Sequence, residues 1–355
     1  MNLPAETQTS VHPRGPLIVR LRNWVGDTTL GVPMLQRLSD AGYALQLVGK
    51  GRARELLAGH GWPVHVLAKT WHERAAQLRR WGTEARAADA GFDRRINSLC
   101  LPYSFSSALD FRLAGLRALG HAYEGRSWLL SRAVQRPQQV HELLVYWHLG
   151  DELLGQRVAP PAAIGLRVSA AHRAQAAALR ARHGIEPGCI VICPFAGGTW
   201  SKQDKTWPDF PNFAAQVLPR FGRTVVVCPG PGEEGVAQAH FAGARVLRGV
   251  GLGAYAALLQ DAALMISNDT GPGHIAAAVG APLVSVLGPS DPAQWRAWGP
   301  TVQLVGGTGI WATPAAVEGA VEAALAAAPH ALAIPLTPGW GSPARGPLQC
   351  PAAGE

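Results

Sequence analysis

The chain has 355 residues, of which 48% are hydrophobic, and a formal net charge of +8 at neutral pH. This length accommodates two domains, and the hydrophobic content excludes wholesale disorder. The sequence contains no apolar run long enough to span a membrane, and residues 1–16 contain no secretory signal core. We therefore expect a cytoplasmic protein.

Strand-like and helical patterns alternate along the chain, which is typical of α/β proteins with parallel sheets. In the first half, strands are predicted at 17–21, 44–48, 64–67 and 95–101. Helical patterns cover 28–41, 73–88, 106–119 and 138–154, and residues 52–58 lie between the second and third strands. The Pro-containing segment 157–166 resembles an interdomain connection.

The second half begins with a predicted helix at 170–183. Its strands are predicted at 189–193, 224–228, 245–247, 263–266, 283–287 and 302–305, and helices that start near residues 210, 233, 252, 272 and 314 separate them. We predict two doubly wound, Rossmann-like halves that face a cleft, at 17–165 and 166–330. We expect a flexible N-terminus at 1–16 and a disordered, Pro- and Gly-rich tail at 331–355.

The most informative polar cluster runs from Ser267 to Gly280 and contains Asp269-Thr270-Gly271-Pro272-Gly273-His274. It follows a buried strand and opens a helix, where free N–H groups and the helix dipole favour an anion. An ordinary capped helix also accounts for Thr270 and Pro272. It does not account for a second polar loop, Gly288-Pro289-Ser290-Asp291-Pro292, after the next strand. Two such loops on one sheet edge predict a binding crevice.

Three further loops follow predicted strands. In the loop Arg22–Thr29, Asp27 is either the cap of the next helix or a general base at the cleft. The loop 194–208 concentrates glycines, hydroxyls and two of the four lysines, which suits phosphate oxygens, although a solvated surface loop is the alternative. In the loop 228–235, Glu233 either binds ribose hydroxyls or stabilises a helix start.

The charge is unevenly distributed along the chain. Residues 1–170 hold 21 Lys and Arg against 13 Asp and Glu, whereas residues 171–355 hold 11 of each. The first half therefore either meets an anionic partner or presents an Arg-rich solvated surface. The five cysteines have no CxxC spacing, so we predict no metal site and expect Cys189, Cys193 and Cys228 to be reduced core residues.

Together these loops resemble glycosyltransferase family 9, the bacterial heptosyltransferases of lipopolysaccharide core assembly. The resemblance covers about residues 17–330 in collinear order. Trp24-Val25-Gly26-Asp27 is similar to the family's N-terminal Gly-Asp loop, and Lys205-Thr206-Trp207-Pro208 to its Lys-x-Trp-Pro motif. The two polar loops of the second half match its C-terminal signatures.

The resemblance implies a GT-B fold, with an N-terminal domain that binds the acceptor and a C-terminal domain that binds a nucleotide sugar. It implies that Asp27, in the loop with Gly26, is the catalytic base, and that Lys205 neutralises the donor diphosphate. It further implies the following donor contacts: Thr199 and Ser201 in the glycine-containing loop, Glu233 with the ribose, Asp269 with a sugar hydroxyl, and Thr270, Gly271 and His274 around the phosphate.

Two positions depart from the family pattern. Gly273 stands where Met or Leu is expected, and Trp200 replaces one member of a hydroxyl pair with Ser201. Either Glu233 or Glu234 contacts the ribose. His274 is either a phosphate contact or a packed helix residue. Trp207 is expected to pack in the core.

The implied reaction is an inverting, metal-independent transfer from a nucleotide sugar, most commonly ADP-heptose in this family, with no cofactor required. The implied acceptor is an anionic glycolipid at the inner membrane, which makes the enzyme a peripheral membrane protein; we expect a monomer and no nucleic acid partner. The alternatives are a nucleotide-sugar 2-epimerase of GT-B fold and a non-catalytic nucleotide-sugar binder. A protein-glycosylating heptosyltransferase ranks lower, because the chain lacks a closely spaced cysteine cluster.

Overall fold

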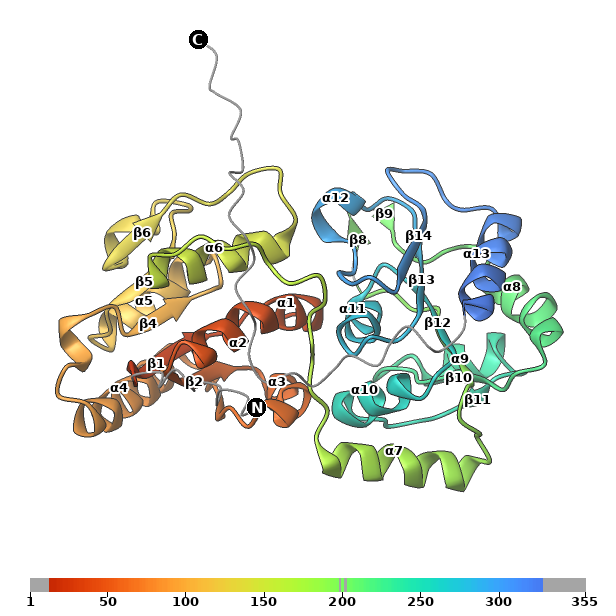
Figure 1. The fold of residues 1–355 in the computed structure, drawn as a ribbon, viewed down its shortest axis with the longest axis horizontal. Coiled ribbons are helices and arrows are strands. Elements are labelled where there is room, and N and C mark those ends of the chain that lie inside the picture. Colours follow the sequence, from red (N-terminus) through yellow and green to blue (C-terminus); the bar gives the residue numbers. More distant parts are fainter. Residues whose placement is uncertain (1–12, 198, 201–202, 328–355) are drawn as a thin grey trace, which may run out of the picture.

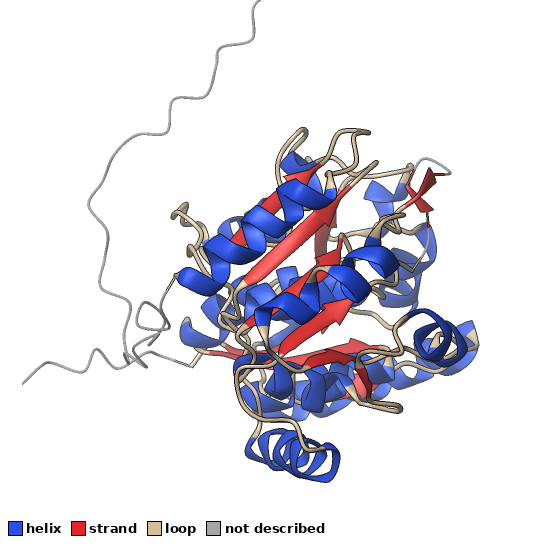
Figure 2. Ribbon diagram, turned by 90° about the vertical axis from the view of Figure 1, so that its right-hand side faces the viewer, coloured by secondary structure: helices blue, strands red, loops and turns tan. Residues whose placement is uncertain are grey.

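The computed structural model describes residues 13–197, 199–200 and 203–327. They form two parallel six-stranded sheets side by side, and helices cover both faces of each sheet (Figures 1 and 2). The strand orders are β3-β2-β1-β4-β5-β6 and β11-β10-β7-β12-β13-β14. The predicted α/β architecture of two doubly wound halves is therefore confirmed.

The first sheet consists of β1 (Gly15–Arg20), β2 (Tyr43–Gly49), β3 (Val64–Val66), β4 (Ser98–Cys100), β5 (Ala118–His121) and β6 (Arg132–Val134). Its helices are α1 (Val25–Leu30), α2 (Val32–Asp40), α3 (Gly51–Leu56), α4 (Trp71–Ala88), α5 (Phe105–Leu113) and α6 (Glu142–Leu154). In β1, Leu17, Ile18 and Val19 are fully buried, because a central parallel strand has helices on both faces.

The second half begins with α7 (Ala170–His183), whose bounds are those predicted. Its sheet consists of β7 (Ile190–Cys193), β10 (Val225–Val227), β11 (Arg245–Val246), β12 (Leu264–Asn268), β13 (Leu283–Leu287) and β14 (Val302–Gly306). Its other helices are α8 (Phe210–Gln216), α9 (Glu234–His240), α10 (Leu252–Gln260), α11 (Gly271–Ala278), α12 (Pro292–Trp295) and α13 (Pro314–Ala326).

The predicted helix at 106–119 is wrong in its second part. The helix α5 ends at Leu113, and Gly115 adopts a left-handed conformation with φ of 70°. The N–H of Leu116 then donates to the carbonyl oxygen of Phe111 at 3.1 Å, which terminates the helix. The chain can therefore turn into β5, and the sequence analysis predicted neither β5 nor β6.

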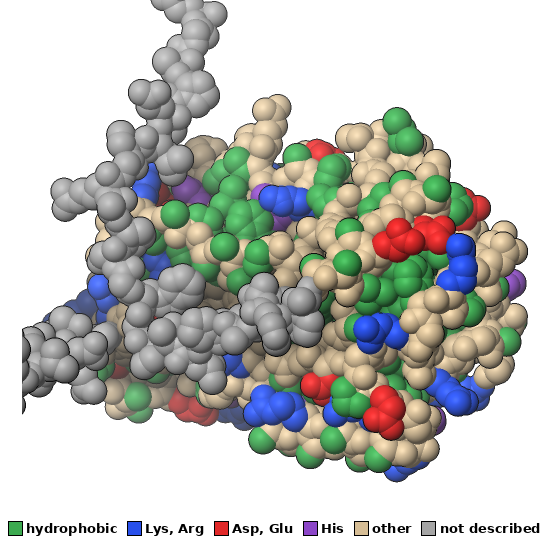
Figure 3. Space-filling model, turned by 45° about the vertical axis from the view of Figure 1, so that its right-hand side comes forward, with side chains coloured by type: hydrophobic (Ala, Val, Ile, Leu, Met, Phe, Trp, Pro, Cys, Tyr) green, Lys and Arg blue, Asp and Glu red, His purple; other side chains and the backbone are tan. Residues whose placement is uncertain are grey.

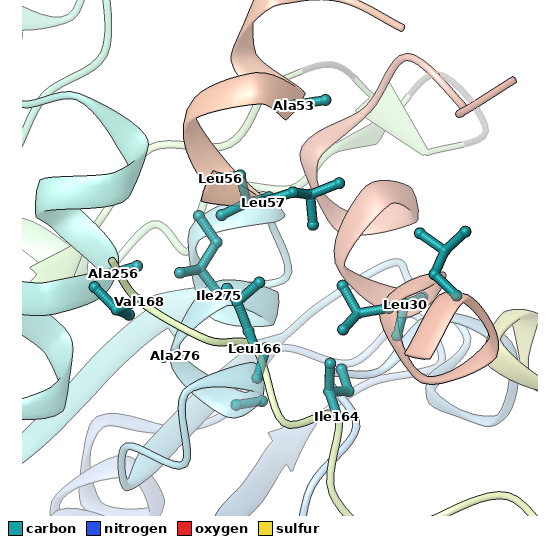
Figure 4. Packing of buried hydrophobic residues seen from close by; sticks show 14 of the residues in the cluster. Leu30, Ala53, Leu56, Leu57, Ile164, Leu166, Val168, Ala256, Ile275 and Ala276 are labelled. Atoms are coloured by element: carbon teal, nitrogen blue, oxygen red, sulfur yellow. The ribbon is translucent and has the colours of Figure 1, made fainter. Parts of the chain in front are cut away.

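One hydrophobic cluster extends across both halves (Figure 4). Leu30 of α1 and Leu56 of α3 belong to the same buried cluster as Ile275 of α11. The segment that joins the halves contributes Leu166, whose N–H donates to the carbonyl oxygen of Ala278 at 2.9 Å. The two sheets are therefore joined by a continuous apolar core.

The surface carries charges of both signs, interspersed with hydrophobic side chains on the face drawn in Figure 3. Cys189 and Cys193 are free and buried, and Cys228 is free and half-buried, as predicted. Within the residues described, no helix combines the length and the hydropathy needed to cross a membrane.

Candidate active site

The two sheets bring their polar loops together at the point where the halves meet. In each sheet the chain connections change direction between two neighbouring strands: between β1 and β4 in the first sheet, and between β7 and β12 in the second. The carboxyl ends of strands at such a switch point are where open α/β sheets bind ligands. The helix α1 follows β1 and α11 follows β12, and these two helices lie side by side (Figure 1).

Two glycines allow this close approach. A Cβ added to Gly26 in α1 would lie 2.9 Å from Cδ2 of His274. A Cβ added to Gly271 would lie 3.1 Å from Cβ of Val25. Both spacings are tighter than ordinary van der Waals contact, so a larger side chain at either position would force its neighbours to move. This contact brings the helix that carries Asp27 against the amino end of α11.

Asp27 is the third residue of α1, and Trp24 holds the N-cap position. The capping alternative therefore does not describe Asp27, which lies in the first turn of the helix and not at its N-cap. Its Oδ1 instead accepts a hydrogen bond of 2.7 Å from the hydroxyl of Tyr146 in α6, and Nε of Arg22 lies 3.5 Å away. Burial raises the pKa of Asp27, while Arg22 and the Tyr146 hydrogen bond oppose that rise. A raised pKa suits a carboxylate that removes a proton near neutral pH.

A buried glutamate organises the side chains around Arg22. Oε1 of Glu142 accepts from Nη1 of Arg22 at 2.8 Å and from the hydroxyl of Tyr103 at 2.7 Å. Oε2 of Glu142 accepts from Nη2 of Arg136 at 2.9 Å. The sequence analysis did not assign Glu142 or Tyr146. The two residues are four positions apart in a predicted helix, which puts both side chains on one face. That spacing is the feature of the sequence from which they could have been found.

In the second half, Lys205 forms an ion pair with Asp269. Nζ of Lys205 lies 3.0 Å from Oδ2 of Asp269, and both side chains are largely buried. Asn268, which the sequence analysis did not assign, holds the loop that carries Lys205. Its Nδ2 donates to the carbonyl oxygen of Pro194 at 2.7 Å, and its Oδ1 accepts from the N–H of Trp207 at 3.0 Å. Trp207 is fully buried, as predicted.

The start of α11 leaves polar groups without capping partners. Thr270 occupies the N-cap position, but its hydroxyl makes no capping hydrogen bond, so the ordinary capped-helix alternative does not describe it. His274 is buried, and its Nδ1 has no hydrogen-bond partner among the described residues. Burial lowers the pKa of His274, and Lys205 lowers it further, whereas Asp269 raises it. The lowered pKa favours the neutral form of this imidazole.

Gly273 has a steric explanation. A Cβ at this position would lie 3.2 Å from Oγ of Ser267, and that hydroxyl donates to the carbonyl oxygen of Asn268 at 2.6 Å. The serine on β12 therefore leaves little room for a larger residue on the first turn of α11.

A cavity of about 290 Å³ lies beside the loops that follow β7 and β10. Glu233 lines it, and the other lining residues include Pro194, Phe195, Thr206 and Val236. Oε2 of Glu233 accepts from the N–H of Gly230 at 2.8 Å, whereas Glu234 binds the N–H of Gly232 and does not line the cavity. Apolar walls with a carboxylate at one side suit a nucleoside.

The remaining predicted residues are placed as follows. Thr199 opens the short strand β8 (Thr199–Trp200), which pairs with β9 (Gln203–Asp204), and Ser201 lies outside the described residues. The predicted N-terminal segment and C-terminal tail lie largely outside them as well. In the Gly288–Pro292 loop, Asp291 caps α12 by accepting from the N–H of Ala293 at 2.9 Å. Among the described residues, no group of three His, Cys, Asp or Glu could hold a metal ion.

Both the sequence and the structure of this chain are similar to those of known proteins. The family model of glycosyltransferase family 9 (heptosyltransferase) matches residues 88–325. A 42-residue segment is 50% identical to lipopolysaccharide heptosyltransferase 3 of Escherichia coli strain K12. That segment is 12% of this chain and 12% of the relative, so the match spans a small part of either protein.

Two solved structures from E. coli have the same fold. The ADP-heptose lipopolysaccharide heptosyltransferase II has a TM-score of 0.70 at 22% identity, over 87% of this chain and 98% of that chain. Heptosyltransferase WaaC, solved with ADP-2-deoxy-2-fluoro heptose, has a TM-score of 0.62 at 20% identity, over 87% of this chain and 99% of that chain.

Proposed function

This chain belongs to glycosyltransferase family 9, and we propose that it transfers heptose from ADP-heptose to a lipopolysaccharide core acceptor or a related cell-envelope glycan. Its fold is the GT-B fold of two Rossmann-like halves. The names of the two structural relatives support the proposed donor, because one is an ADP-heptose transferase and the other was solved with an ADP-heptose analogue.

In the proposed reaction, Asp27 removes the proton of an acceptor hydroxyl while that oxygen attacks the anomeric carbon of the donor. The bond from this carbon to the diphosphate oxygen breaks, so the configuration inverts and negative charge grows on the leaving ADP. Lys205 and the amino end of α11 stabilise that growing charge, which lowers the barrier. The proposed transfer needs no cofactor and no metal ion.

The observation that supports this proposal is the packing of α1, which carries Asp27, against α11, whose His274 lies close enough to the Lys205–Asp269 pair to feel both charges. The carboxylate comes from the first half, the ammonium comes from the second half, and the contact of Gly26 with His274 holds the two halves together at this point. A base on one side and a cation on the other match a reaction that removes a proton and releases a diphosphate.

The other proposed donor contacts rest on the family resemblance, and for some of them the positions of the residues give support. Glu233 would bind the ribose from the wall of the 290 Å³ cavity. Asp269 would bind a hydroxyl of the donor sugar. Thr270, Gly271 and the free Nδ1 of His274 would bind phosphate oxygens at the start of α11. Thr199 and Ser201 would add hydroxyl donors from the neighbouring loop.

The excess of positive charge in the first half supports an anionic glycolipid acceptor. We propose that the enzyme works as a monomer on the cytoplasmic face of the inner membrane, where such an acceptor is presented.

Substitution Asp27→Asn tests the assignment of the base. We expect kcat to fall about a hundredfold or more, since the amide cannot accept the proton, while the affinity for ADP-heptose in calorimetric titration stays unchanged. Asp151→Asn is the matched control, because Asp151 is also largely buried and ion-paired, with Arg37 at 2.6 Å. Near-normal kcat in Asp27→Asn would remove Asp27 from the mechanism. Turnover of the nucleotide sugar without any acceptor would favour an epimerase instead.

A further inference from the structure

Four aromatic side chains in the loops after β4 and β5 have no role in the proposed transfer. We call them the aromatic platform: Tyr103, Phe105, Tyr123 and Trp128. The ring centroids of Tyr103 and Tyr123 are 5.6 Å apart, and those of Phe105 and Trp128 are 6.0 Å apart. Trp128 is 71% exposed and Tyr123 is 45% exposed, which is unusual for such large side chains.

The sheet topology places the platform at the same edge as Asp27. Tyr103 and Phe105 follow β4, and Tyr123 follows β5. Trp128 belongs to a short 3-10 helix at Arg126–Leu129. Because β1, β4 and β5 are adjacent parallel strands, the loops after them lie at one edge of the sheet.

A buried arginine fixes the loops that carry the platform. Arg126 is fully buried, and its Nε and Nη2 donate to the carbonyl oxygen of His121 at 3.1 and 3.0 Å. Its Nη1 donates to the carbonyl oxygens of Pro102 and Ser104. The loop after β5 is therefore tied to the loop after β4, and the backbone that carries the exposed rings is held in place before any ligand arrives.

The platform is continuous with the side chains around the proposed base. The guanidinium of Arg22 lies 4.5 Å from the ring centroid of Tyr103, and Nε of the same arginine is 3.5 Å from Oδ1 of Asp27. The hydroxyl of Tyr103 donates to Glu142. A molecule that covers the platform therefore extends from the position where the acceptor hydroxyl meets Asp27.

We propose that the aromatic platform binds a sugar ring of the acceptor other than the ring that is glycosylated. The apolar C–H face of this sugar stacks on Tyr123 and Trp128, and Tyr103 forms the end of the platform nearest Asp27. This inference rests on the proposed function and assigns the part of the acceptor beyond the glycosylated sugar to named residues. Exposed Trp and Tyr also suit a bilayer surface, and the test separates that partner from a glycan.

The test measures binding of core oligosaccharide from which the lipid has been removed, to the full chain and to its variants. We expect Trp128→Ala and Tyr123→Ala each to weaken this binding about tenfold. Their affinity for ADP-heptose should stay that of the wild type. Trp71→Ala is the control, because Trp71 is also exposed, at 53%, but begins α4 and lies outside the platform. Its oligosaccharide affinity should not change.

The inference is overturned if the wild type does not bind the oligosaccharide, or if both platform variants bind it as the wild type does. It is also overturned if Trp128→Ala reduces sedimentation with phosphatidylglycerol vesicles and leaves oligosaccharide binding intact. Failure of the proposed function gives a different result. In that case ADP-heptose does not bind, while the platform variants still lose affinity for the oligosaccharide.

Discussion

The hydrogen bond from Tyr146 to Asp27 offers a test of the proposed base, because its removal should change the pKa of Asp27 and hence the pH dependence of the reaction. Both side chains are buried, and the hydroxyl donates to Oδ1 of Asp27 at 2.7 Å. Such a bond stabilises the ionised carboxylate, so its removal in Tyr146→Phe should raise the pKa of Asp27. Hydrogen bonds to charged groups contribute about 1.5–3 kcal/mol, which corresponds to a rise of about 1 to 2 in the pKa.

The assay is the dependence of kcat/KM on pH. Because Asp27 must be ionised to accept a proton, kcat/KM rises with pH through the pKa of this group. In Tyr146→Phe that rise should move about 1 to 2 pH units higher, and the rate should approach the wild-type value above both pKa values. Tyr255→Phe is the matched control, since Tyr255 is buried in α10 and its hydroxyl contacts Sδ of Met265. An unchanged profile in Tyr146→Phe, or an equal shift in the control, would refute this reasoning.

Two further predictions concern the donor side and the contact between the halves. Lys205→Gln should weaken ADP binding about tenfold to a hundredfold in calorimetric titration, because it removes a charged hydrogen-bond donor, and the exposed Lys50→Gln should bind ADP normally. Equal affinities would exclude Lys205 from the diphosphate site. Gly26→Ala should lower the free energy of unfolding by about 1–3 kcal/mol in urea, since its Cβ would meet His274. In Gly235→Ala the added Cβ meets no atom within 4 Å, so comparable losses in both variants would contradict the steric explanation.

Much of the fold follows from patterns that are local in the sequence. The buried strands β1, β7, β12 and β13 are short apolar runs between polar loops, and such runs are recognisable without neighbours. The errors arose where local signals compete. Residues 106–119 have a helical pattern, but the left-handed Gly115 stops it, and β5 is only four residues long. So short a strand forms because it pairs with β4, and that pairing cannot be read from the local sequence.

The candidate site was predictable only in part, for a similar reason. Motifs and the family resemblance selected Asp27, Lys205 and Asp269. The structure pairs Lys205 with Asp269, and it packs α1, which carries Asp27, against α11, which starts two residues after Asp269. The partners that set their properties come from distant positions. Tyr146 is 119 residues from Asp27, and Asn268 is 61 residues from Trp207. Such pairs become neighbours only when helices pack on the sheets, so a single sequence could not reveal them.

The apolar core that continues from one half into the other has a consequence for cooperativity. Helix α11 contributes Ile275 and Ala276 to that core, and its first turn carries Thr270 and His274 of the proposed phosphate site. A ligand held there stabilises the packing of both halves, because neither sheet can unfold without exposing this helix. Binding of the nucleotide should therefore raise the melting temperature of the whole chain. The two halves should unfold in a single cooperative transition.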